Sequence, residues 1–239
     1  MLQLSLSADV TVTAKSSFVN LADFEDPTRS LVGIAQSASQ GAITARQLEA
    51  RPIMRTGEVL ETVPGVLISQ HSGEGKANQY YLRGFNLDHG TDFATTVAGM
   101  PVNMPTHGHG YSDLNFLMPE LVSGVQFSKG PYFADQGDFA IAGAATITDA
   151  NSLARPLMRV GGGDQGFGRA IVAGSQAVGP GTLLAGLEVQ RNDGPWLRPD
   201  RFRKVNGVVR FSRGDALNGF AVTGMGYFLD DPVNGDQFQ

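Results

Sequence analysis

The sequence predicts an α+β domain that is followed by a series of long antiparallel β-strands. Three observations support this fold class. Short apolar runs closed by glycine or proline turns follow one another between residues 58 and 149, with no long helix between them. From residue 154 onward, segments of about ten residues alternate apolar and polar side chains. Glycine is frequent, with 31 residues, and only 17% of residues are charged, as expected for strands joined by tight turns.

Length and composition exclude several classes of protein. A chain of 239 residues can hold one or two domains with a substantial core. Its 18 Lys and Arg against 23 Asp and Glu give a net charge of -5, which argues against nucleic acid as a partner because nucleic-acid-binding domains usually carry a basic face. The absence of cysteine excludes disulfides, zinc-thiolate sites and cysteine nucleophiles.

The first sixty residues predict one strand and two short helices. Residues 2–14 alternate apolar and polar side chains like a strand, and the residues from 15 to 40 are mixed and rich in turns. A short helix over residues 44–49 is expected to begin at the N-cap Thr44. A second helix is expected over residues 57–62, capped by Thr56.

Beyond Pro64-Gly65, which forces a turn, the sequence alternates between short strands and glycine-rich loops. The apolar and β-branched runs predict strands at residues 66–69, 79–85, 93–97, 121–128 and 144–148.

The C-terminal part shows regular two-residue periodicity. Leu183 and Leu187 share one face of a predicted strand, whereas Leu184 and Glu188 share the other. Apolar residues outward and polar residues inward at this strand length are typical of a membrane barrel, but a soluble antiparallel sheet with one wet face has the same pattern. Five such strands are expected, at residues 155–163, 167–177, 181–192, 203–213 and 217–230.

The order of motifs resembles a known family. GEVLETVPGVLISQ, NQYYLRGF, TTVAGMPVN, PELVSGVQFSKGP and GDFAIAGAATITD occur in the same series as in the plug domain of TonB-dependent outer-membrane receptors. The resemblance implies an α+β plug domain over residues 28–150, an N-terminal extended segment over residues 1–27, and the first strands of an incomplete antiparallel transmembrane β-barrel over residues 151–239.

Five strands are too few to form a closed barrel. Bacterial barrels need at least about 8 strands, and plugged transporters have about 22. Open strand edges cannot face lipid, so we expect residues 154–239 to be the first quarter of a barrel that is cut off at Gln239. The N-terminus lacks the features of a signal peptide, so we also expect that Met1 is not the native start.

The resemblance also implies partners and a location. Such receptors lie in the outer membrane of Gram-negative bacteria, contact its lipid, bind a small imported solute and are driven by TonB and its inner-membrane complex. Residues 9–14 resemble the TonB box, which pairs with TonB as an added strand; an ordinary strand is the alternative. This segment consists of Asp9, Val10, Thr11, Val12, Thr13 and Ala14.

Two motifs match structural features of the family. Arg83-Gly84 matches the "R-G" end of a plug strand, and its expected role is packing of the plug against the barrel wall rather than ligand contact. Gly130-Pro131 matches the family's strand-closing "G-P" and is also expected to be structural.

No catalytic motif is present, so we do not expect an enzyme, and no cofactor is predicted. The G-x-S-x-G, H-E-x-x-H and Walker A patterns are all missing from the sequence. His107 and His109 stand in a glycine-rich loop and could grip a metal or a metal chelate, although an H-x-H pair is more often polar surface. Whether a metal binds stays open. The candidate ligand residues are His107, His109, Asn86, Asp88, His89 and Tyr111.

The implied function is TonB-dependent import of a scarce solute, such as a siderophore or a metal chelate, into the periplasm. The alternative from another class is a soluble β-rich binding or adhesion module without transport activity. A reading frame that continues past Gln239 for about four hundred residues of alternating strands would favour the receptor, a length that follows from about 22 strands of about 10 residues with their loops.

Overall fold

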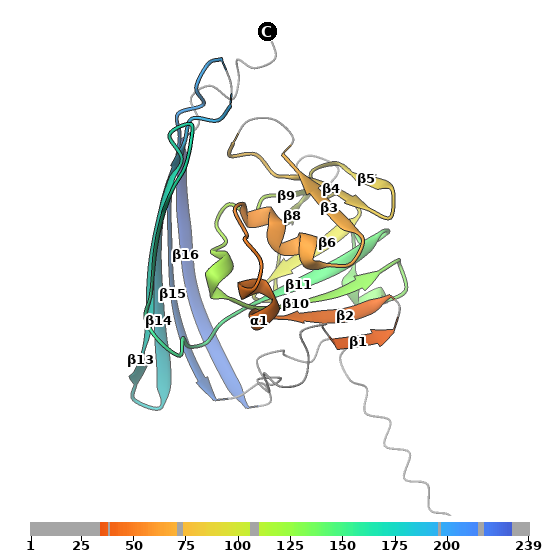
Figure 1. Cartoon of the computed structure of the whole chain (residues 1–239). Coiled ribbons are helices and arrows are strands. Elements are labelled where there is room, and N and C mark those ends of the chain that lie inside the picture. The colour runs from red at the N-terminus through yellow and green to blue at the C-terminus, as the bar shows by residue number, and fades with distance from the viewer. Residues whose placement is uncertain are drawn as a thin grey trace, which may run out of the picture.

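A computed structural model describes residues 34–37, 39–70, 74–105, 110–195, 197–214 and 218–230. The described chain has two parts: a mixed α/β domain and a curved sheet that lies beside it (Figure 1). We call residues 34–149 the first domain and the curved sheet the wall. Among the described residues, no helix is both long and apolar enough to cross a membrane.

The first domain is built on a six-stranded sheet. Its order is β1-β2-β10-β11-β6-β7, and all neighbours are antiparallel except β11 and β6, which are parallel. The strands are β1 (Ile34–Ser37), β2 (Gln40–Thr44), β6 (Phe93–Val97), β7 (Met100–Pro101), β10 (Val122–Lys129) and β11 (Gly143–Asp149).

Smaller elements cover this sheet. A three-stranded sheet and a two-stranded ribbon are formed by β3 (Val66–Ser69), β4 (Gln79–Leu82), β5 (Phe85–Leu87), β8 (Asn103–Met104) and β9 (Tyr111–Ser112). The helices are all short, namely α1 (Ala45–Glu49) and the 3₁₀ segments η2 (Thr56–Thr62), η3 (Asp88–Gly90), η5 (Pro119–Leu121) and η6 (Ala134–Gln136). Their apolar residues meet in one core that includes Val59, Leu60, Val63, Phe93, Val125 and Ile147.

Most predicted elements of the first domain are confirmed. The strands at residues 66–69 and 93–97 are found residue for residue, and Thr44 is the N-cap of α1. The Gln47 side-chain oxygen accepts hydrogen bonds from the Thr44 backbone N–H, at 2.9 Å, and from the Thr44 hydroxyl, at 3.3 Å. This contact between the N-cap and the third helical residue fixes where the helix begins.

Three predictions for the first domain were wrong. The single strand expected at residues 79–85 is a hairpin, because Arg83 and Gly84 both adopt positive φ, of 52° and 86°, and turn the chain between β4 and β5. Thr56 is the first residue of η2 rather than its cap, a position that Arg55 takes. β1 lies in the region that was expected to be mixed and rich in turns, and β2 begins at the last residue of that region. β2 gains its second partner from β10, which is far away in sequence.

The wall is a five-stranded antiparallel sheet, as predicted. Its strands follow in chain order and are β12 (Leu157–Gly162), β13 (Gly168–Val178), β14 (Gly181–Asn192), β15 (Phe202–Gly214) and β16 (Gly219–Asp230). Each end differs from the predicted range by at most two residues. Leu187 is 50% exposed, whereas Leu184 and Glu188 are each 1% exposed, so the two faces differ as the alternation predicts.

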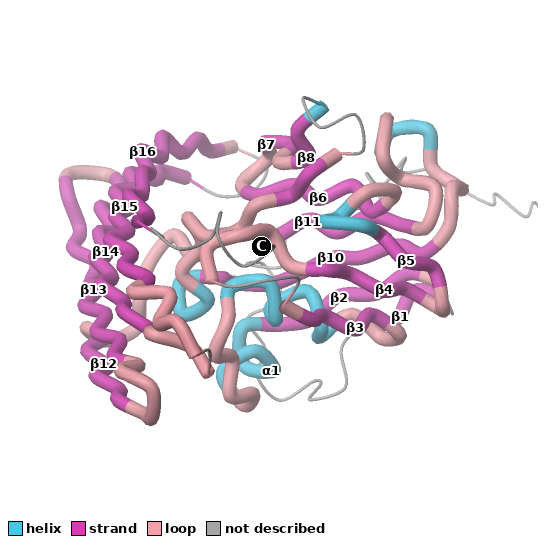
Figure 2. Tube along the Cα trace, turned by 90° about the horizontal axis from the view of Figure 1, so that it is seen from above, coloured by secondary structure: helices cyan, strands magenta, loops and turns pink. Residues whose placement is uncertain are grey.

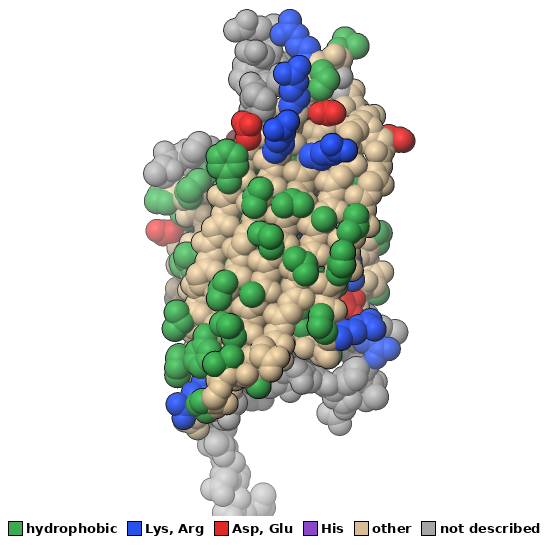
Figure 3. Space-filling model, turned by 90° about the vertical axis from the view of Figure 1, so that its left-hand side faces the viewer, with side chains coloured by type: hydrophobic (Ala, Val, Ile, Leu, Met, Phe, Trp, Pro, Cys, Tyr) green, Lys and Arg blue, Asp and Glu red, His purple; other side chains and the backbone are tan. Residues whose placement is uncertain are grey.

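The outer face of the wall is apolar over its middle. Figure 3 shows hydrophobic side chains spread over the central part of this face and Lys and Arg side chains near its ends. The exposed apolar residues include Met158, Val172, Leu187, Val189, Val205, Val209, Val222 and Phe228. Exposed apolar surface of this extent marks a site of interaction with protein or membrane.

The inner face of the wall packs against the first domain. Met118 and Leu121, in and next to η5, form a small second core with Ile171, Ala173 and Leu184 of the wall. Figure 2 shows the wall running along one side of the first domain. The wall residue Gly186 allows this close approach, because a Cβ there would lie 2.9 Å from Leu121 Cδ1.

Candidate functional site

A buried network of charges joins the first domain to the wall. Glu120 of η5 accepts two hydrogen bonds from the Arg169 guanidinium of β13, at 2.6 and 2.8 Å. Arg169 Nε also donates to Glu188 of β14, at 2.5 Å, and Glu188 Oε2 lies 3.1 Å from Lys204 Nζ of β15. Arg159 of β12 lies 3.6 Å from Glu120. These five residues, which we call the interface network, connect four wall strands to one short segment of the first domain.

The charges of the network match one another. Burial alone would raise the pKa of Glu120, but the hydrogen bonds and charge of Arg169, together with Arg159, outweigh it and hold that pKa below its usual range. Glu188 and Lys204 are almost completely buried, and a buried charge is tolerated only with a charged, hydrogen-bonded partner. The Asn206 side chain continues the contact by donating to the Phe116 carbonyl, at 2.6 Å.

A second contact between the parts lies among polar and aromatic side chains. Tyr227 of β16 donates to Asp113 Oδ2 at 2.5 Å, and Asp113 Oδ1 accepts from the backbone N–H and the side-chain amide of Asn115, both at 2.8 Å. Tyr111 lies nearby, and its hydroxyl accepts the backbone N–H of Ala77 at 2.7 Å. This group brings β9, the loop after it and a wall strand together.

Tyr80 and Tyr111 remain protonated in this environment. The pKa of Tyr80 is raised by complete burial and by the negative charge of Asp113. Burial also raises the pKa of Tyr111, and the Ala77 hydrogen bond offsets only part of that effect. Among the described residues, the buried Tyr80 hydroxyl has no hydrogen-bond partner. Both phenols can therefore act as neutral hydrogen-bond donors or acceptors.

The structure brings several predicted ligand residues together. The ring centroids of His89 and Tyr111 are 5.2 Å apart, and His89 Nδ1 lies 3.3 Å from the Ala77 carbonyl. Asp88 is exposed and its Oδ1 lies 3.7 Å from His89 Nε2. Asn86 is exposed on β5 and accepts a hydrogen bond from the Gln79 side chain. We call His89, Tyr111, Asp88 and Asn86 the loop cluster.

Other predicted residues lie elsewhere or outside the described chain. His107, His109 and the predicted TonB box at residues 9–14 fall outside the described residues. Arg83 is exposed at the turn between β4 and β5, so its packing against a wall stays a prediction. Gly130 has a φ of 94° and donates to the Ala142 carbonyl at 2.7 Å, and the exposed Pro131 follows it. This geometry fits a strand-closing turn.

The loop that follows β3 reaches the wall as well. Glu74 accepts a hydrogen bond from the Asn192 side chain at 2.8 Å, and its backbone N–H donates to Asp200 at 3.3 Å. Asn192 is the last residue of β14, and Asp200 lies in the loop between β14 and β15. Among the described residues, no group of three or more His, Asp or Glu side chains could hold a metal ion.

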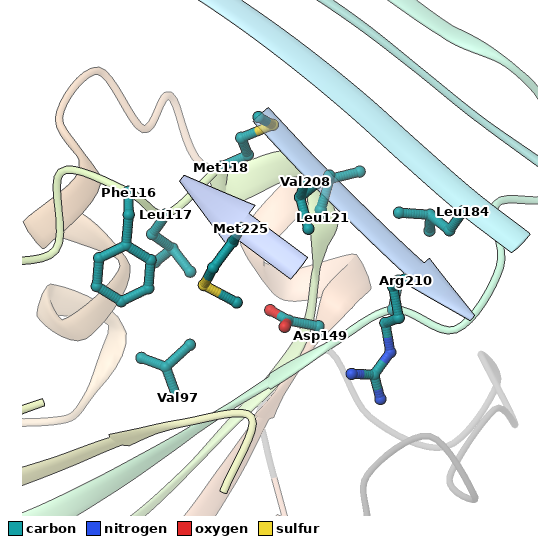
Figure 4. Close-up of a pocket in the computed structure, with 11 residues that line it drawn as sticks. Val97, Phe116, Leu117, Met118, Leu121, Asp149, Leu184, Val208, Arg210 and Met225 are labelled. Carbon is teal, nitrogen blue, oxygen red and sulfur yellow. The ribbon is translucent and has the colours of Figure 1, made fainter. Parts of the chain in front are cut away.

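A small cavity lies between the two parts, with a volume of about 20 Å³. Figure 4 shows Asp149 and Arg210 facing it among apolar residues such as Leu117 and Met225. Burial raises the pKa of Asp149, and the charge of Arg210 offsets only part of this rise. Arg210 itself donates to Asn151 at 3.0 Å and to Thr223 at 2.7 Å.

Sequence reasoning missed the residues that make these contacts. The predicted alternation puts Glu188 on the inner face of its strand, and a charge on the inner face of a barrel strand is the one signal that points to a partner inside. Nothing in the sequence pairs Glu120 with Arg169, which is 49 residues away. Asp113 and Tyr227 are 114 residues apart.

The fold and its contacts point to one class of protein. In this class, a sheet with an apolar outer face holds a separate domain against its inner face. Residues 31–144 match the family model of the TonB-dependent receptor plug domain. The described chain therefore has a plug-like domain beside antiparallel strands, which is the arrangement of TonB-dependent receptors. The first domain is therefore the plug domain; its exact limits at residues 28 and 150 stay a prediction.

Solved structures of receptors share this fold at low identity. A variant of the ferric enterobactin receptor PfeA from Pseudomonas aeruginosa matches with a TM-score of 0.60 and 15% identity, over 84% of this chain and 34% of that one. The siderophore receptor PirA from Acinetobacter baumannii matches with a TM-score of 0.54 and 16% identity, over 81% and 32%. The copper transporter OprC matches with a TM-score of 0.59 and 18% identity, over 84% and 32%. The chain thus spans about a third of the length of these receptors.

The lengths of the wall connections orient the molecule. β13 and β14 are joined by only two residues, 179–180, whereas β14 and β15 are joined by nine, 193–201, at the opposite end. In outer-membrane barrels the short turns face the periplasm and the longer loops face outside. By this pattern, the end of the wall that carries residues 193–201 corresponds to the outer end of such barrels, and Glu74 contacts the wall there.

Proposed function

We propose that this protein takes part in TonB-dependent import of a scarce solute, such as a ferric siderophore or another metal chelate, across the outer membrane. The observation that carries the proposal is a plug domain fixed to the inner face of barrel strands by the interface network. A domain in this place blocks the route through the barrel, so passage of a solute requires that the domain change. Coupling to TonB would supply the work, because no ATP is available outside the inner membrane.

We propose that the solute binds at plug loops near the outer end of the wall. The loop cluster combines an imidazole, a phenol, a carboxylate and an amide, and such groups can coordinate a metal or accept and donate hydrogen bonds to a chelate. His107 and His109, in the loop between β8 and β9, remain the first candidates for ligand contact. Siderophore and copper receptors among the similar structures support a metal-bearing solute.

The alternative, a soluble binding or adhesion module, accounts poorly for the outer face of the wall. That face exposes Val172, Leu187, Val205 and Phe228 at 44% or more of their surface, and exposed apolar surface of this extent in water favours aggregation. Lipid solvates the same surface without cost. Cell fractionation decides between the two, because the receptor is expected in the outer-membrane fraction and the module is expected in the soluble fraction.

The histidine proposal is tested by replacing both His107 and His109 with Ala. Losing two contacts to a metal or a charged group, at about 1.5–3 kcal/mol each, should weaken binding by at least about tenfold. Binding and uptake of ferric enterobactin, ferric pyoverdine and Cu²⁺ would be measured, with exposed Asp135→Asn as the control. Equal uptake by the variant and the parent at solute levels below the dissociation constant would remove both histidines from the site. The candidates would then be Asn86, Asp88 and His89.

The coupling proposal is tested by deleting residues 9–14. If these residues pair with TonB, the deletion should abolish uptake and leave solute binding unchanged, because strand addition to TonB takes place away from the binding loops. A deletion of equal length at residues 20–25 serves as the control. Normal uptake by the 9–14 deletion would show that this segment is an ordinary strand.

A further inference from the structure

Two arginines face each other on the outer surface of the wall. Arg191 of β14 and Arg203 of β15 are direct cross-strand partners, and both are exposed. They share the outer face with Val189 and Val205, the exposed pair two residues further along the same strands. Like charges placed directly opposite each other destabilise a strand pair. An anion between the two guanidinium groups would reverse this effect.

The loop that joins these strands adds two further arginines. Arg198 and Arg201 are both exposed, and we call the four side chains, Arg191, Arg198, Arg201 and Arg203, the arginine rim. Figure 3 shows basic side chains gathered at this upper end of the outer face. Asp230 of β16 lies opposite Arg203 on its other side, and Asp193 and the buried Asp200 lie in the same loop. The rim therefore keeps an excess of positive charge.

Below the rim, the same face is hollowed. The floor of this hollow includes Gly174, Ala185, Gly207, Gly224 and Gly226, and its sides include Val172, Leu187 and Val209. Gly207 and Gly226 are direct cross-strand partners, so no side chain fills the centre. Strands rise about 3.4 Å per residue, and Gly207 is four residues from Arg203, so the hollow lies roughly 14 Å below the rim.

We propose that the arginine rim binds the phosphate of a phosphorylated lipid of the outer leaflet, whose acyl chain lies over the glycine-floored hollow. The guanidinium group matches phosphate oxygens through paired hydrogen bonds. The apolar hollow and the cationic rim lie on the same outer face of the wall. The rim lies nearer the end of the strands, where a lipid headgroup would be, and the hollow lies nearer their middle, where an acyl chain would be. This inference rests on the proposed location in the outer membrane, and it concerns a surface that the imported solute does not touch.

The test is lipid binding by the protein purified from outer membranes in detergent. Delipidated protein is titrated with lipid A, a bisphosphorylated glycolipid, and with the same lipid after removal of its phosphates. The Arg191→Gln/Arg203→Gln variant should bind lipid A at least about tenfold more weakly, because it loses charge-assisted hydrogen bonds. The parent should prefer lipid A to the dephosphorylated lipid, and added salt should weaken binding.

Arg213→Gln is the matched control, because Arg213 is exposed on the same face of β15 at its opposite end. It should change affinity by less than about twofold, within the usual range for a surface change. Equal affinity of the double variant and the parent, or an equal loss in Arg213→Gln, would overturn the proposal, as would equal binding of the dephosphorylated lipid. Should the double variant fail to fold, Asp230→Asn decides: tighter binding supports the proposal and unchanged binding refutes it.

The outcome can be separated from that of the proposed function. Lipid binding that depends on the rim, in a protein that takes up no solute, would leave this inference standing and remove the transport proposal. Normal uptake together with rim-independent lipid binding would do the reverse. A protein absent from the outer-membrane fraction would remove both.

Discussion

At the scale of single residues, the interface network determines how the plug domain is held. Glu188 is its centre, since it contacts Arg169 on one side and Lys204 on the other. The network has two carboxylates and three basic groups, and its most buried members are Glu188 and Lys204. Removing one partner of a buried pair leaves the other without compensation, which is more costly than removing both.

We therefore expect Glu188→Gln to lower the free energy of unfolding by about 3–5 kcal/mol, because Lys204 would remain buried as an unpaired charge. The Glu188→Met/Lys204→Met variant should lose less, since it leaves no buried charge from this pair. Urea unfolding followed by circular dichroism measures both values. A double variant that is less stable than Glu188→Gln would contradict this account.

Asp149 leads to a prediction with a defined pH dependence. Its pKa is raised in the folded protein, chiefly by burial, so its contribution favours folding at low pH and is lost as pH rises above the unfolded value of about 3.9. Asp149→Asn should therefore be more stable than the parent at neutral pH, and the difference should vanish at pH 3. Asp138→Asn, at an exposed position, should show no such gain. Equal unfolding midpoints of Asp149→Asn and the parent at pH 7 would refute the prediction.

At the scale of elements, the sequence predicts the wall better than the plug domain. Two-residue alternation sets the strand limits within the wall, because each strand pairs with the next one in sequence and has one apolar face. In the plug domain, β2 depends on β10, more than seventy residues later, and the turn at Arg83 depends on a positive φ in a residue that usually avoids it. These features come from distant partners rather than from local pattern.

The candidate site follows the same division. Residue types and loop positions predict Asn86, Asp88, His89 and Tyr111 as candidates. Their ligand role stays a prediction, although the rings of His89 and Tyr111 do lie close together. The roles of Asp113 and Glu120 become evident only from their contacts with Tyr227 and Arg169 of the wall. The alternation of apolar and polar residues cannot predict such contacts between a domain and the strands around it. It shows which face of a strand is buried, but it does not show which residue of the other domain lies opposite.

The packing of wall on plug can be tested with two glycines of the same sheet. A Cβ on Gly186 would lie 2.9 Å from Leu121 and 3.3 Å from Met118, whereas one on Gly207 would meet nothing within 4 Å. Gly186→Val should destabilise the protein by about 1–3 kcal/mol through overpacking. Gly207→Val should be nearly neutral, because it faces outward. Similar unfolding free energies for the two variants would show that the inner face is not packed as described.

At the scale of the whole molecule, the plug domain and the wall differ in the kind of surface that they expose. The plug domain has its own core, which includes Leu60, Phe93 and Ile147. Its strands pair with one another and with no strand of the wall. The wall has an apolar outer face and ends in the two edge strands β12 and β16. Unpaired strand edges pair with other chains when they are exposed. The plug domain therefore resembles a soluble protein, whereas the wall exposes apolar side chains and unpaired strand edges.

The wall cannot form a pore by itself. Five strands are fewer than the smallest bacterial barrel, which has about 8, so the purified 239-residue chain should give no discrete conductance steps in planar bilayers. The physical reason is that an open edge leaves backbone N–H and C=O groups unpaired in lipid. Stable single-channel currents from the purified chain, absent from a sample of residues 28–150 alone, would overturn this prediction.

Residues 28–150, in contrast, should fold as a soluble unit when they are expressed alone. Their core contacts lie within the range. The wall adds the interface network, the small second core at Met118 and Leu121, and hydrogen bonds to Asp113, Phe116 and Glu74. Freed from the wall, Glu120 would meet water, which solvates its carboxylate. We expect dispersed amide signals by NMR and a cooperative thermal transition, while residues 151–239 aggregate without lipid. Narrow amide dispersion and no transition would show that the plug domain needs the barrel to fold.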